Sequence, residues 1–217
     1  MWPYLWDGFQ LTLVLLVGSG IIATVVGTLL ASMRVSPVLP FRGFGTSYVN
    51  TFRNTPLVVL FILAVEGLPA IGVRPAFPGL GLNVFEVLAV GTLGTYTAAF
   101  VCEALRSGIN TVDTGQAEAA RAVGMTFGQT LATVVMPQAF RAVIPPLASV
   151  YIAMAKNTSV AAAFGVTEAT FQLSRMIEAT VASAGVAFLG IAVGYMLIVW
   201  VISGVAALFE RQVATSR

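Results

Sequence analysis

The sequence predicts an all-α membrane protein with about five transmembrane helices. Only 9% of its 217 residues are charged, whereas a soluble domain carries about 25%. Hydrophobic residues make up 58% of the chain. Long uncharged runs alternate with short charged segments, and several runs approach the roughly 20 residues that a helix needs to cross a bilayer. We therefore expect one membrane domain, residues 1–217, in contact with lipid.

The first two expected spans differ in how clearly the sequence marks them. The first covers about 8–33 and contains no charged residue before Arg34. The second covers about 44–65 but carries Arg53 inside it. Pro56 interrupts the same span, because proline lacks the backbone N–H that a continuous helix requires. This span is therefore expected to contain a polar break.

The other three expected spans cover about 86–106, 142–166 and 184–209. Lys156 lies inside the fourth of the five spans. The uncharged run 125–140 is the main ambiguity, since its apolar content alone would allow another span. It is short for that purpose and contains scattered threonine and glutamine residues. We expect this run to form a helix that lies along, or dips into, the cytoplasmic interface.

The arginine distribution predicts the orientation, because basic residues concentrate in cytoplasmic loops. With the N-terminus outside and the C-terminus inside, eight arginines lie on the cytoplasmic side and two on the outer side: Arg34, Arg42, Arg53, Arg106, Arg121, Arg141, Arg211 and Arg217 inside, Arg74 and Arg175 outside. The inverted orientation would reverse this count. The preferred orientation places the segment 113–137 in the cytoplasm.

Composition also excludes several kinds of site. The chain has no histidine, so it has no imidazole base and no histidine metal site. Its single cysteine, Cys102, cannot form an internal disulfide, and a net charge of +2 gives no reason to expect nucleic acid. Lys156 is the only lysine, and no glycine-rich phosphate loop surrounds it. We expect no catalytic residue, metal or cofactor on this chain, and any ATP would be hydrolysed by a partner.

The cytoplasmic segment contains a short polar helix with an unusual pattern. Glu118-Ala119-Ala120 is followed by Arg121, Gly124 and, further on, Pro137. Glu118 near the start of the helix would oppose the positive end of the helix dipole, and the alanines would leave a narrow face for close docking. Gly124 suits a left-handed turn at the C-terminal end. The alternative is an ordinary solvated loop helix.

This spacing resembles the EAA signature of bacterial ABC-importer permeases. Further stretches resemble the polar-amino-acid permeases in the order that this family shows them, over about residues 45–165: Arg53-Asn54-Thr55-Pro56-Leu57, Glu103 to Ile109, Gly115 to Ala120, Met136 to Arg141 and Lys156-Asn157-Thr158-Ser159. Methionine stands at 136 where the family has leucine. Residues 33–38, 53–56 and 106–112 are similar to the glutamate-importer permeases of actinobacteria.

The resemblance implies a type I ABC importer permease in the bacterial cytoplasmic membrane, for a polar amino acid and most specifically glutamate. It implies ATPase coupling through Glu118, Ala119, Ala120, Arg121 and Gly124. The implied partners are an ATP-binding cassette ATPase dimer that binds ATP and magnesium, a second permease subunit and an extracytoplasmic amino-acid-binding protein. The second permease is expected to be a homologue, with a homodimer as the alternative.

Candidate substrate-pathway residues are the polar groups that interrupt two spans: Lys156, Asn157, Thr158 and Ser159 in one, Arg53 and Thr55 in the other. Ionisable groups within spans are costly and usually face a cavity or the bundle interior. Two alternatives remain open. Lys156 could pair with a helix-end carbonyl or with Glu103. Arg53 could be an interfacial arginine beside a helix that starts at Pro56.

Two other classes of function compete with an ABC permease. A secondary transporter driven by an ion gradient would carry its own coupling acid in the membrane. Here the acids concentrate at the ends of expected spans: Glu66, Glu86, Glu103, Glu168 and Glu178. An intramembrane enzyme is disfavoured because the chain has no histidine and no GxSxG motif.

Overall fold

The computed structural model describes residues 2–75, 79, 81–179 and 184–215 of the protein. Within these residues the chain is built from helices: α1 (Trp2–Arg34), α2 (Leu39–Asn54), α3 (Leu57–Phe61), η1 (Ile62–Gly67), α4 (Leu68–Ala70), α5 (Val84–Asn110), α6 (Thr114–Ala122), α7 (Phe127–Thr130), η3 (Leu131–Val135), α8 (Met136–Asn157), η4 (Thr158–Phe164), α9 (Ala169–Ala179) and α10 (Ala184–Thr215). The elements η1 and η3 are π-helical turns, and η4 is a 3₁₀-helix.

Four helical stretches in the described part of the chain are long and apolar enough to cross a membrane, or five if one bent pair is a single span. The expected spans 8–33, 86–106 and 184–209 coincide with α1, α5 and α10. Helices α1 and α5 extend beyond both expected ends, and α10 extends beyond its expected C-terminal end. The reason is that the sequence estimate stopped near charged or polar residues, whereas a helix continues into the interface wherever its backbone bonds can form.

The second expected span, 44–65, is not one straight helix. The pair Leu39–Asn54 and Leu57–Ala70 is bent by 106°. Thr55 is extended at the break, with φ −99° and ψ 128°. Pro56 imposes this conformation, since the residue before a proline is disfavoured in the helical region. The predicted interruption at Pro56 is therefore confirmed, and it redirects the chain sharply.

The expected cytoplasmic segment ending at 137 and the expected span starting at 142 are joined without a break. A single helical stretch runs from Phe127 to Phe164, through α7, η3, α8 and η4. The predicted interfacial helix 125–140 is thus the first part of a longer helix. Pro137 does not end the helix because it lies in the first turn of α8, directly after the π-helical turn η3.

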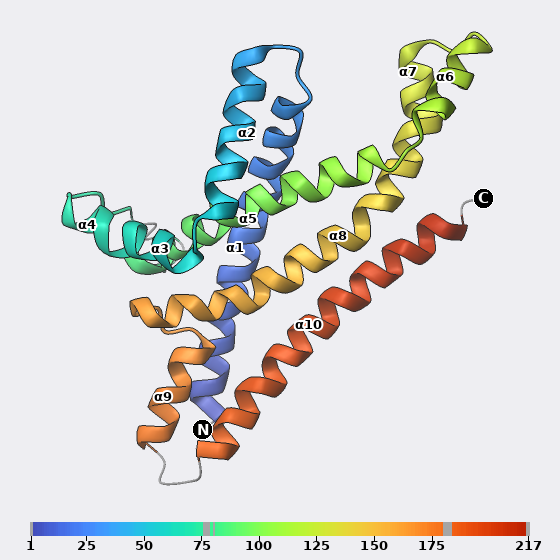
Figure 1. Ribbon diagram of the computed structural model, residues 1–217. Coiled ribbons are helices and arrows are strands. Elements are labelled where there is room, and N and C mark those ends of the chain that lie inside the picture. Colours follow the sequence, from blue (N-terminus) through green and yellow to red (C-terminus); the bar gives the residue numbers. More distant parts are fainter. Residues whose placement is uncertain (1, 76–78, 80, 180–183, 216–217) are drawn as a thin grey trace.

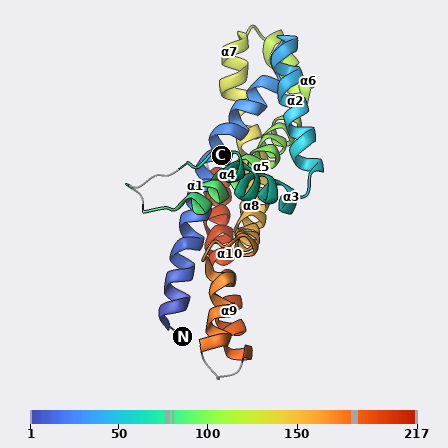
Figure 2. The same cartoon turned by 90° about the vertical axis from the view of Figure 1, so that its left-hand side faces the viewer.

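The helices form an elongated bundle with two distinct ends (Figures 1 and 2). The N-terminus and α9 lie at one end, and α6 and α7 lie at the other together with the junction of α1 and α2. Helices α5 and α8 cross α1 obliquely, and α10 runs beside α8 (Figure 1). Helix α8 runs from the α6–α7 end to the middle of the bundle, from where η4 leads to α9 (Figure 1).

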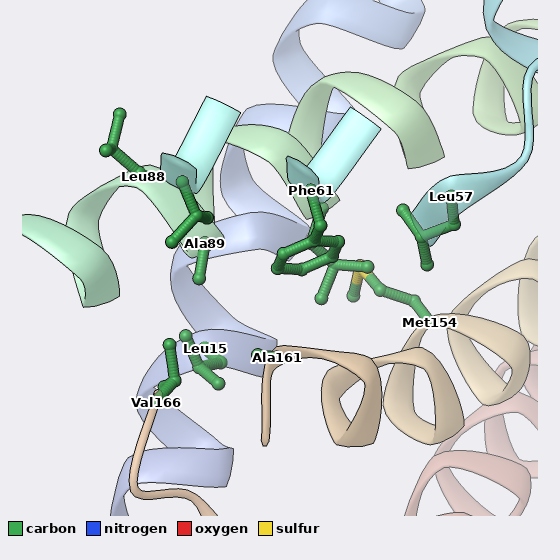
Figure 3. Packing of buried hydrophobic residues seen from close by; sticks show 10 residues of the cluster. Leu15, Leu57, Phe61, Leu88, Ala89, Met154, Ala161 and Val166 are labelled. Atoms are coloured by element: carbon green, nitrogen blue, oxygen red, sulfur yellow. The ribbon is translucent and has the colours of Figure 1, made fainter. Parts of the chain in front are cut away.

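The main buried cluster joins the break at Pro56 to the far end of α8 (Figure 3). Phe61 is fully buried, and its ring stacks on Phe164 with centroids 5.3 Å apart. Leu57 and Met154 belong to the same cluster, which places the start of α3 beside the last turns of α8. Because lipid is as apolar as these side chains, close packing rather than water exclusion stabilises such contacts in a membrane.

Candidate functional site

The first candidate site is the hairpin formed by α6, α7 and the turn between them, residues 114–130. The Asp113 side chain caps α6 by accepting a hydrogen bond from the Gly115 N–H at 2.8 Å. Glu118 lies in the middle of α6, so the prediction that Glu118 offsets the helix dipole near its start is wrong. Asp113 supplies the negative charge at that end instead.

Gly124 ends α6 in the manner that the sequence predicted. Its φ of 93° lies in the left-handed region that favours glycine. The Gly124 N–H donates to the Arg121 carbonyl at 3.0 Å, and the Met125 N–H donates to the Ala120 carbonyl at 3.1 Å. These two bonds form a Schellman motif, which satisfies carbonyls at the end of the helix and turns the chain towards α7.

The hairpin is attached to α8 in two ways. Through α7 and η3, its second half continues directly into α8. In addition, the Gln138 side chain on α8 donates to the Gln116 side chain on α6 at 2.6 Å. A capping box between Thr126 and Gln129 fixes the start of α7. Helix α6 is therefore linked to α8 both through the continuous helix and through the glutamine pair.

The free surface of the hairpin combines charged and apolar groups. Glu118, Ala119, Arg121 and Gly124 are exposed, while Ala120 is buried against the rest of the hairpin. Val123 and Phe127 are 81% and 72% exposed at the tip. Sequence reasoning missed both, although an aromatic residue directly after a capping threonine was visible there. Exposed apolar groups rimmed by charges are typical of a protein-binding surface.

The second candidate site is the end of α8. Lys156 is exposed and Asn157 is half-buried, whereas Thr158 is fully buried. The Thr158 hydroxyl donates to the Ala155 carbonyl at 2.7 Å and lies 3.5 Å from the Tyr195 hydroxyl. The Ser159 hydroxyl donates to the Lys156 carbonyl at 2.7 Å. The four predicted residues thus differ in exposure: Thr158 is directed into the helix packing, whereas Lys156, Asn157 and Ser159 are at least partly exposed.

Arg53 and Thr55 lie on the other side of the Pro56 break from Leu57, which packs near α8. The Thr55 hydroxyl donates to the Thr51 carbonyl at 2.8 Å, so it satisfies α2 at its end. Arg53 is exposed and in the last turn of α2. The two polar stretches are followed in sequence by α3 and η4, and these two elements contact each other, with the Phe61 ring stacked on Phe164.

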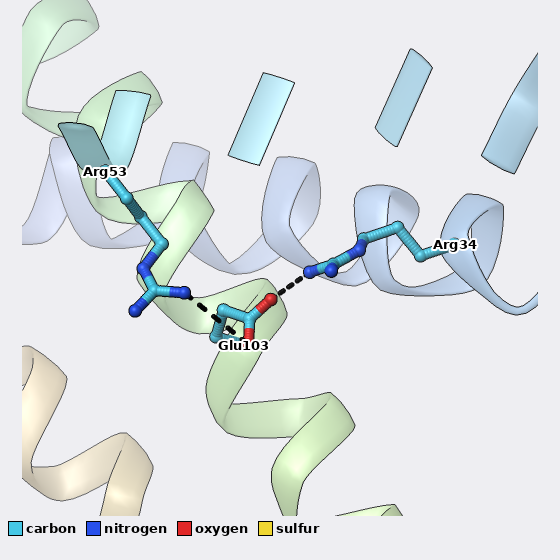
Figure 4. A network of polar contacts seen from close by, with 3 residues as sticks. All are labelled: Arg34, Arg53 and Glu103. Carbon is cyan, nitrogen blue, oxygen red and sulfur yellow. Dashed lines mark hydrogen bonds and ion pairs between the residues drawn. The ribbon is translucent and has the colours of Figure 1, made fainter. Parts of the chain in front are cut away.

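Arg53 belongs to an arginine–glutamate cluster with Arg34 and Glu103 (Figure 4). Arg34 forms a hydrogen-bonded ion pair with Glu103, and an Arg53 guanidinium nitrogen lies 3.7 Å from the other Glu103 oxygen. Arg53 also lies over the Phe100 ring, 5.9 Å from its centroid. The cluster connects α1, α2 and α5. Among the described residues the ion pairs of Glu103 are formed with Arg34 and Arg53, and the alternative pairing of Lys156 with Glu103 is not observed.

Sequence reasoning placed Glu168 with four other acids at the ends of spans, but its surroundings in the structure differ from theirs. Its side chain is fully buried between α1, α9 and α10. It accepts hydrogen bonds from the Thr170 and Phe171 N–H groups and from the Tyr195 hydroxyl, and it lies within reach of Thr12. A buried carboxylate with hydrogen-bond partners on α1, α9 and α10 is suited to hold these helices together.

Comparison with known proteins adds independent information. The profile of one protein family, described as binding-protein-dependent transport system inner membrane component, matches residues 23–215. The glutamate transport system permease protein GluC of Corynebacterium glutamicum is 42% identical over 201 residues, which cover 90% of this chain and 88% of GluC. The glutamate/aspartate import permease protein GltJ of Escherichia coli is 33% identical over 217 residues, which cover 97% of this chain and 87% of GltJ.

Two solved structures share the arrangement of helices. The crystal structure of an amino acid ABC transporter with histidines matches with a TM-score of 0.82 and 30% identity, over 97% of this chain and 94% of that chain. The inward-facing MetNI methionine ABC transporter matches with a TM-score of 0.73 and 20% identity, over 98% of this chain and 97% of that chain. The second likeness concerns the fold alone.

Proposed function

The chain belongs to the family of binding-protein-dependent transport system inner membrane components, and we propose that it imports glutamate or a closely related amino acid. It is a membrane-spanning permease subunit of an ABC importer with the type I permease fold. The preference for glutamate rests on two relatives whose names specify glutamate transport. Both relatives match about nine-tenths of this chain or more.

One observation supports the proposed mechanism most directly. The exposed hairpin at residues 114–130 is continuous with α8, whose other end carries Lys156 and Asn157. We propose that an ATPase dimer, which binds ATP and magnesium, contacts the hairpin through its charged and apolar surface. Closure of the dimer would displace the hairpin, and α8 would turn in response and so change the surroundings of its polar end.

The proposed assembly contains three further partners. A second permease, homologous or identical, would complete the translocation pathway, because one bundle of this size cannot enclose it. GltJ has a counterpart named GltK that is also similar to this chain, at 36% identity over 162 residues, and this favours a homologous second permease. An extracytoplasmic binding protein would deliver the amino acid at the end of the bundle formed by the N-terminus and α9.

Charge reversal in the hairpin tests the coupling role. Glu118→Lys should weaken association with the ATPase about tenfold or more, equivalent to roughly 1.4 kcal/mol, since the exposed acid lies beside the apolar tip. The change should leave the fold intact because Glu118 is exposed. Co-purification of the ATPase with the permease measures the effect. Glu210→Lys, an exposed acid outside the hairpin, is the matched control, and an equal loss in both variants would argue against docking at Glu118.

The orientation follows from the arginine distribution and the two ends of the bundle. We propose an outer N-terminus and an inner C-terminus, with spans near 8–33, 44–65, 86–106, 142–166 and 184–209. The second span then includes the bend at Pro56, and the cytoplasmic segment 113–137 includes the hairpin and the start of α8. The end of α1, which contains Arg34, and helix α6, which contains Arg121, lie at the same end of the bundle (Figure 1), and this supports the proposed orientation.

Thiol labelling tests this orientation. Cysteine introduced at Trp2 should react with a membrane-impermeant reagent from outside, and cysteine introduced at Thr215 should react only after the membrane is opened. The native Cys102 is buried and can be replaced by alanine to give a clean background. Labelling in the reverse pattern would contradict the proposed orientation.

For the substrate pathway we propose the accessible polar groups at the two breaks: Lys156, Asn157, Ser159, Arg53 and Thr55. The Lys156 and Arg53 cations and the Asn157 amide can bind the carboxylates of an acidic amino acid. The hydroxyl of Thr158 is directed into the packing, so we assign Thr158 to the support of this site.

Removal of the Asn157 amide tests the pathway. Asn157→Leu should raise the amino-acid concentration for half-maximal stimulation of the assembled ATPase by roughly tenfold or more, because a hydrogen bond to a charged group contributes about 1.5–3 kcal/mol. Ala153→Leu, an apolar change at an exposed position on the preceding turn, is the control. An unchanged dose-response for Asn157→Leu would exclude the amide from the pathway.

A further inference from the structure

The two oxygens of the buried Glu168 carboxylate have separate partners. Oε1 accepts the N–H groups of Thr170 and Phe171 at 2.7 and 3.0 Å. These bonds cap the N-terminus of α9 in the usual manner. Oε2 accepts the Tyr195 hydroxyl at 2.7 Å and lies 3.3 Å from the Thr12 hydroxyl. Capping of α9 uses one oxygen, so Oε2 has a role that capping does not explain.

Tyr195 extends this network to the end of α8. Its hydroxyl, besides donating to Glu168, lies 3.2 Å from the Thr170 hydroxyl and 3.5 Å from the Thr158 hydroxyl. Its ring packs edge-on against Phe9, with centroids 5.7 Å apart. Thr158 directly follows Asn157. The Glu168 cluster, defined as Thr12, Thr158, Glu168, Thr170 and Tyr195, therefore contacts the backbone that presents Lys156 and Asn157.

The same cluster is anchored to α1 by a hydrogen bond and by close backbone packing. The Thr12 hydroxyl accepts the Ala169 N–H at 3.1 Å. A Cβ atom at Gly8 would lie only 2.8 Å from the Ala169 Cα, so α1 and the start of α9 are in direct backbone contact. Thr12 and Glu168 are both fully buried. The cluster thus links the end of α8, through Thr158 and Tyr195, to α1 and the start of α9.

We propose that Glu168 is a positioning residue for transport, which acts through Tyr195 and Thr158 to hold the end of α8 against α1, α9 and α10. This proposal rests on the assignment of Lys156 and Asn157 to the substrate pathway. It makes the Glu168 cluster the fixed end of α8 and the hairpin the movable end. A displacement of the hairpin would then turn α8 about the cluster instead of sliding it through the membrane.

Removal of one hydroxyl tests the proposal without a change of volume in the core. Tyr195→Phe cuts the path from Glu168 to Thr158 and leaves the α9 cap in place. Tyr151→Phe is the matched control, since it removes a hydroxyl on α8 that lies 2.6 Å from the Thr24 hydroxyl on α1 and has no contact with Glu168. Both variants are made in the full chain, in the reconstituted importer, on a Cys102→Ala background.

Spin labels at Ala153 on α8 and Leu197 on α10 report the position of the end of α8 that the cluster holds. Labels at Leu29 on α1 and Phe44 on α2 report a distant part of the bundle. All four positions are exposed. We expect Tyr195→Phe to raise the population of displaced distances for the first pair roughly fivefold, as expected for one buried hydrogen bond. The second pair should stay unchanged, and Tyr151→Phe should affect the first pair less.

Glu168→Asp provides an independent variant, because aspartate caps helices well but is one methylene too short to keep both sets of bonds. Glu168→Asp should reproduce the effect of Tyr195→Phe. The double variant Glu168→Asp/Tyr195→Phe should show no further change, since each single substitution removes the same contact. Unchanged distances in Tyr195→Phe, equal broadening of both label pairs, or additive effects would each overturn the proposal. These distances do not require transport, so a failed transport assignment at Asn157 remains distinguishable from a failed role of Glu168.

Discussion

Glu103→Gln is expected to lower the free energy of unfolding by about 3 kcal/mol, the lower end of the range for a broken buried ion pair, because the Arg34–Glu103 pair is only partly buried. The Arg34 side chain is 11% exposed and the Glu103 side chain 27% exposed, so the charge left on Arg34 is poorly solvated. Arg53 would lose its acidic partner as well. Thermal unfolding in nanodiscs should show a fall in Tm of roughly 6–12 °C.

Two further variants distinguish this mechanism from a general sensitivity to lost acids. Glu178→Gln, at an exposed position on α9, should change Tm very little. The double variant Arg34→Met/Glu103→Leu should recover most of the loss, because replacing both partners of a buried pair by apolar residues is often neutral. A Glu103→Gln protein with unchanged Tm would show that the arginine–glutamate cluster does not stabilise the junction of α1, α2 and α5.

Gly108→Ala and Gly91→Ala are expected to change stability in opposite directions, although both lie on α5. A Cβ at Gly108 would lie 2.2 Å from the Val143 Cγ2 and 2.9 Å from the Val143 Cα and N atoms. Because backbone atoms of α8 are involved, a change of rotamer cannot relieve the overlap, and the helices must separate. We expect a loss of about 1–3 kcal/mol, as for other overpacked sites.

At Gly91 a Cβ would meet no heavy atom within 4 Å among the described residues. Alanine there should leave stability unchanged or raise it by up to about 1 kcal/mol, since alanine is the better helix former. The thermal unfolding temperatures of the two variants, compared with the unsubstituted protein, measure both effects. A Gly108→Ala protein as stable as Gly91→Ala would mean that α5 and α8 do not pack as closely as Val143 indicates.

The α5–α8 contact also concerns the proposed mechanism. Gly108 lies near the end of α5, two residues before its last residue, and Val143 lies seven residues after the start of α8. This crossing therefore lies between the hairpin and the held end of α8. A helix that turns about the Glu168 cluster must roll at this contact, and a glycine allows such movement with the smallest separation of the two backbones.

Several features could be predicted from the sequence because they depend on neighbours along the chain. The interruption at Pro56 follows from a missing backbone donor, and the left-handed Gly124 follows from the turn after a short helix. The run Gly8–Met33 was predicted as a membrane helix because it contains neither a charged residue nor a proline before Arg34. The sequence reading ended the cytoplasmic segment at Pro137 and so missed the continuity of the helix from Phe127. The helix continues because Pro137 lies in the first turn of α8, where proline is tolerated.

The candidate sites were predicted less completely than the elements that carry them. Lys156 and Asn157 were found because polar groups stand out in an apolar run. The burial of Thr158, next to them, depends on Tyr195, 37 residues away in sequence. Val123 and Phe127 escaped notice because apolar residues are common throughout this chain and only their exposure at the hairpin tip distinguishes them.

By itself the sequence determined that this protein lies in a membrane, which segments form its long helices and where a polar segment interrupts them. Hydropathy, proline and glycine act locally, and the bilayer requires each span to satisfy its own backbone. Tertiary structure alone decided the partners of the buried charges. Arg34 meets Glu103 across 69 positions and Thr12 meets Glu168 across 156. A charge within the membrane requires a partner, and only the crossing of the helices decides which residue that partner is.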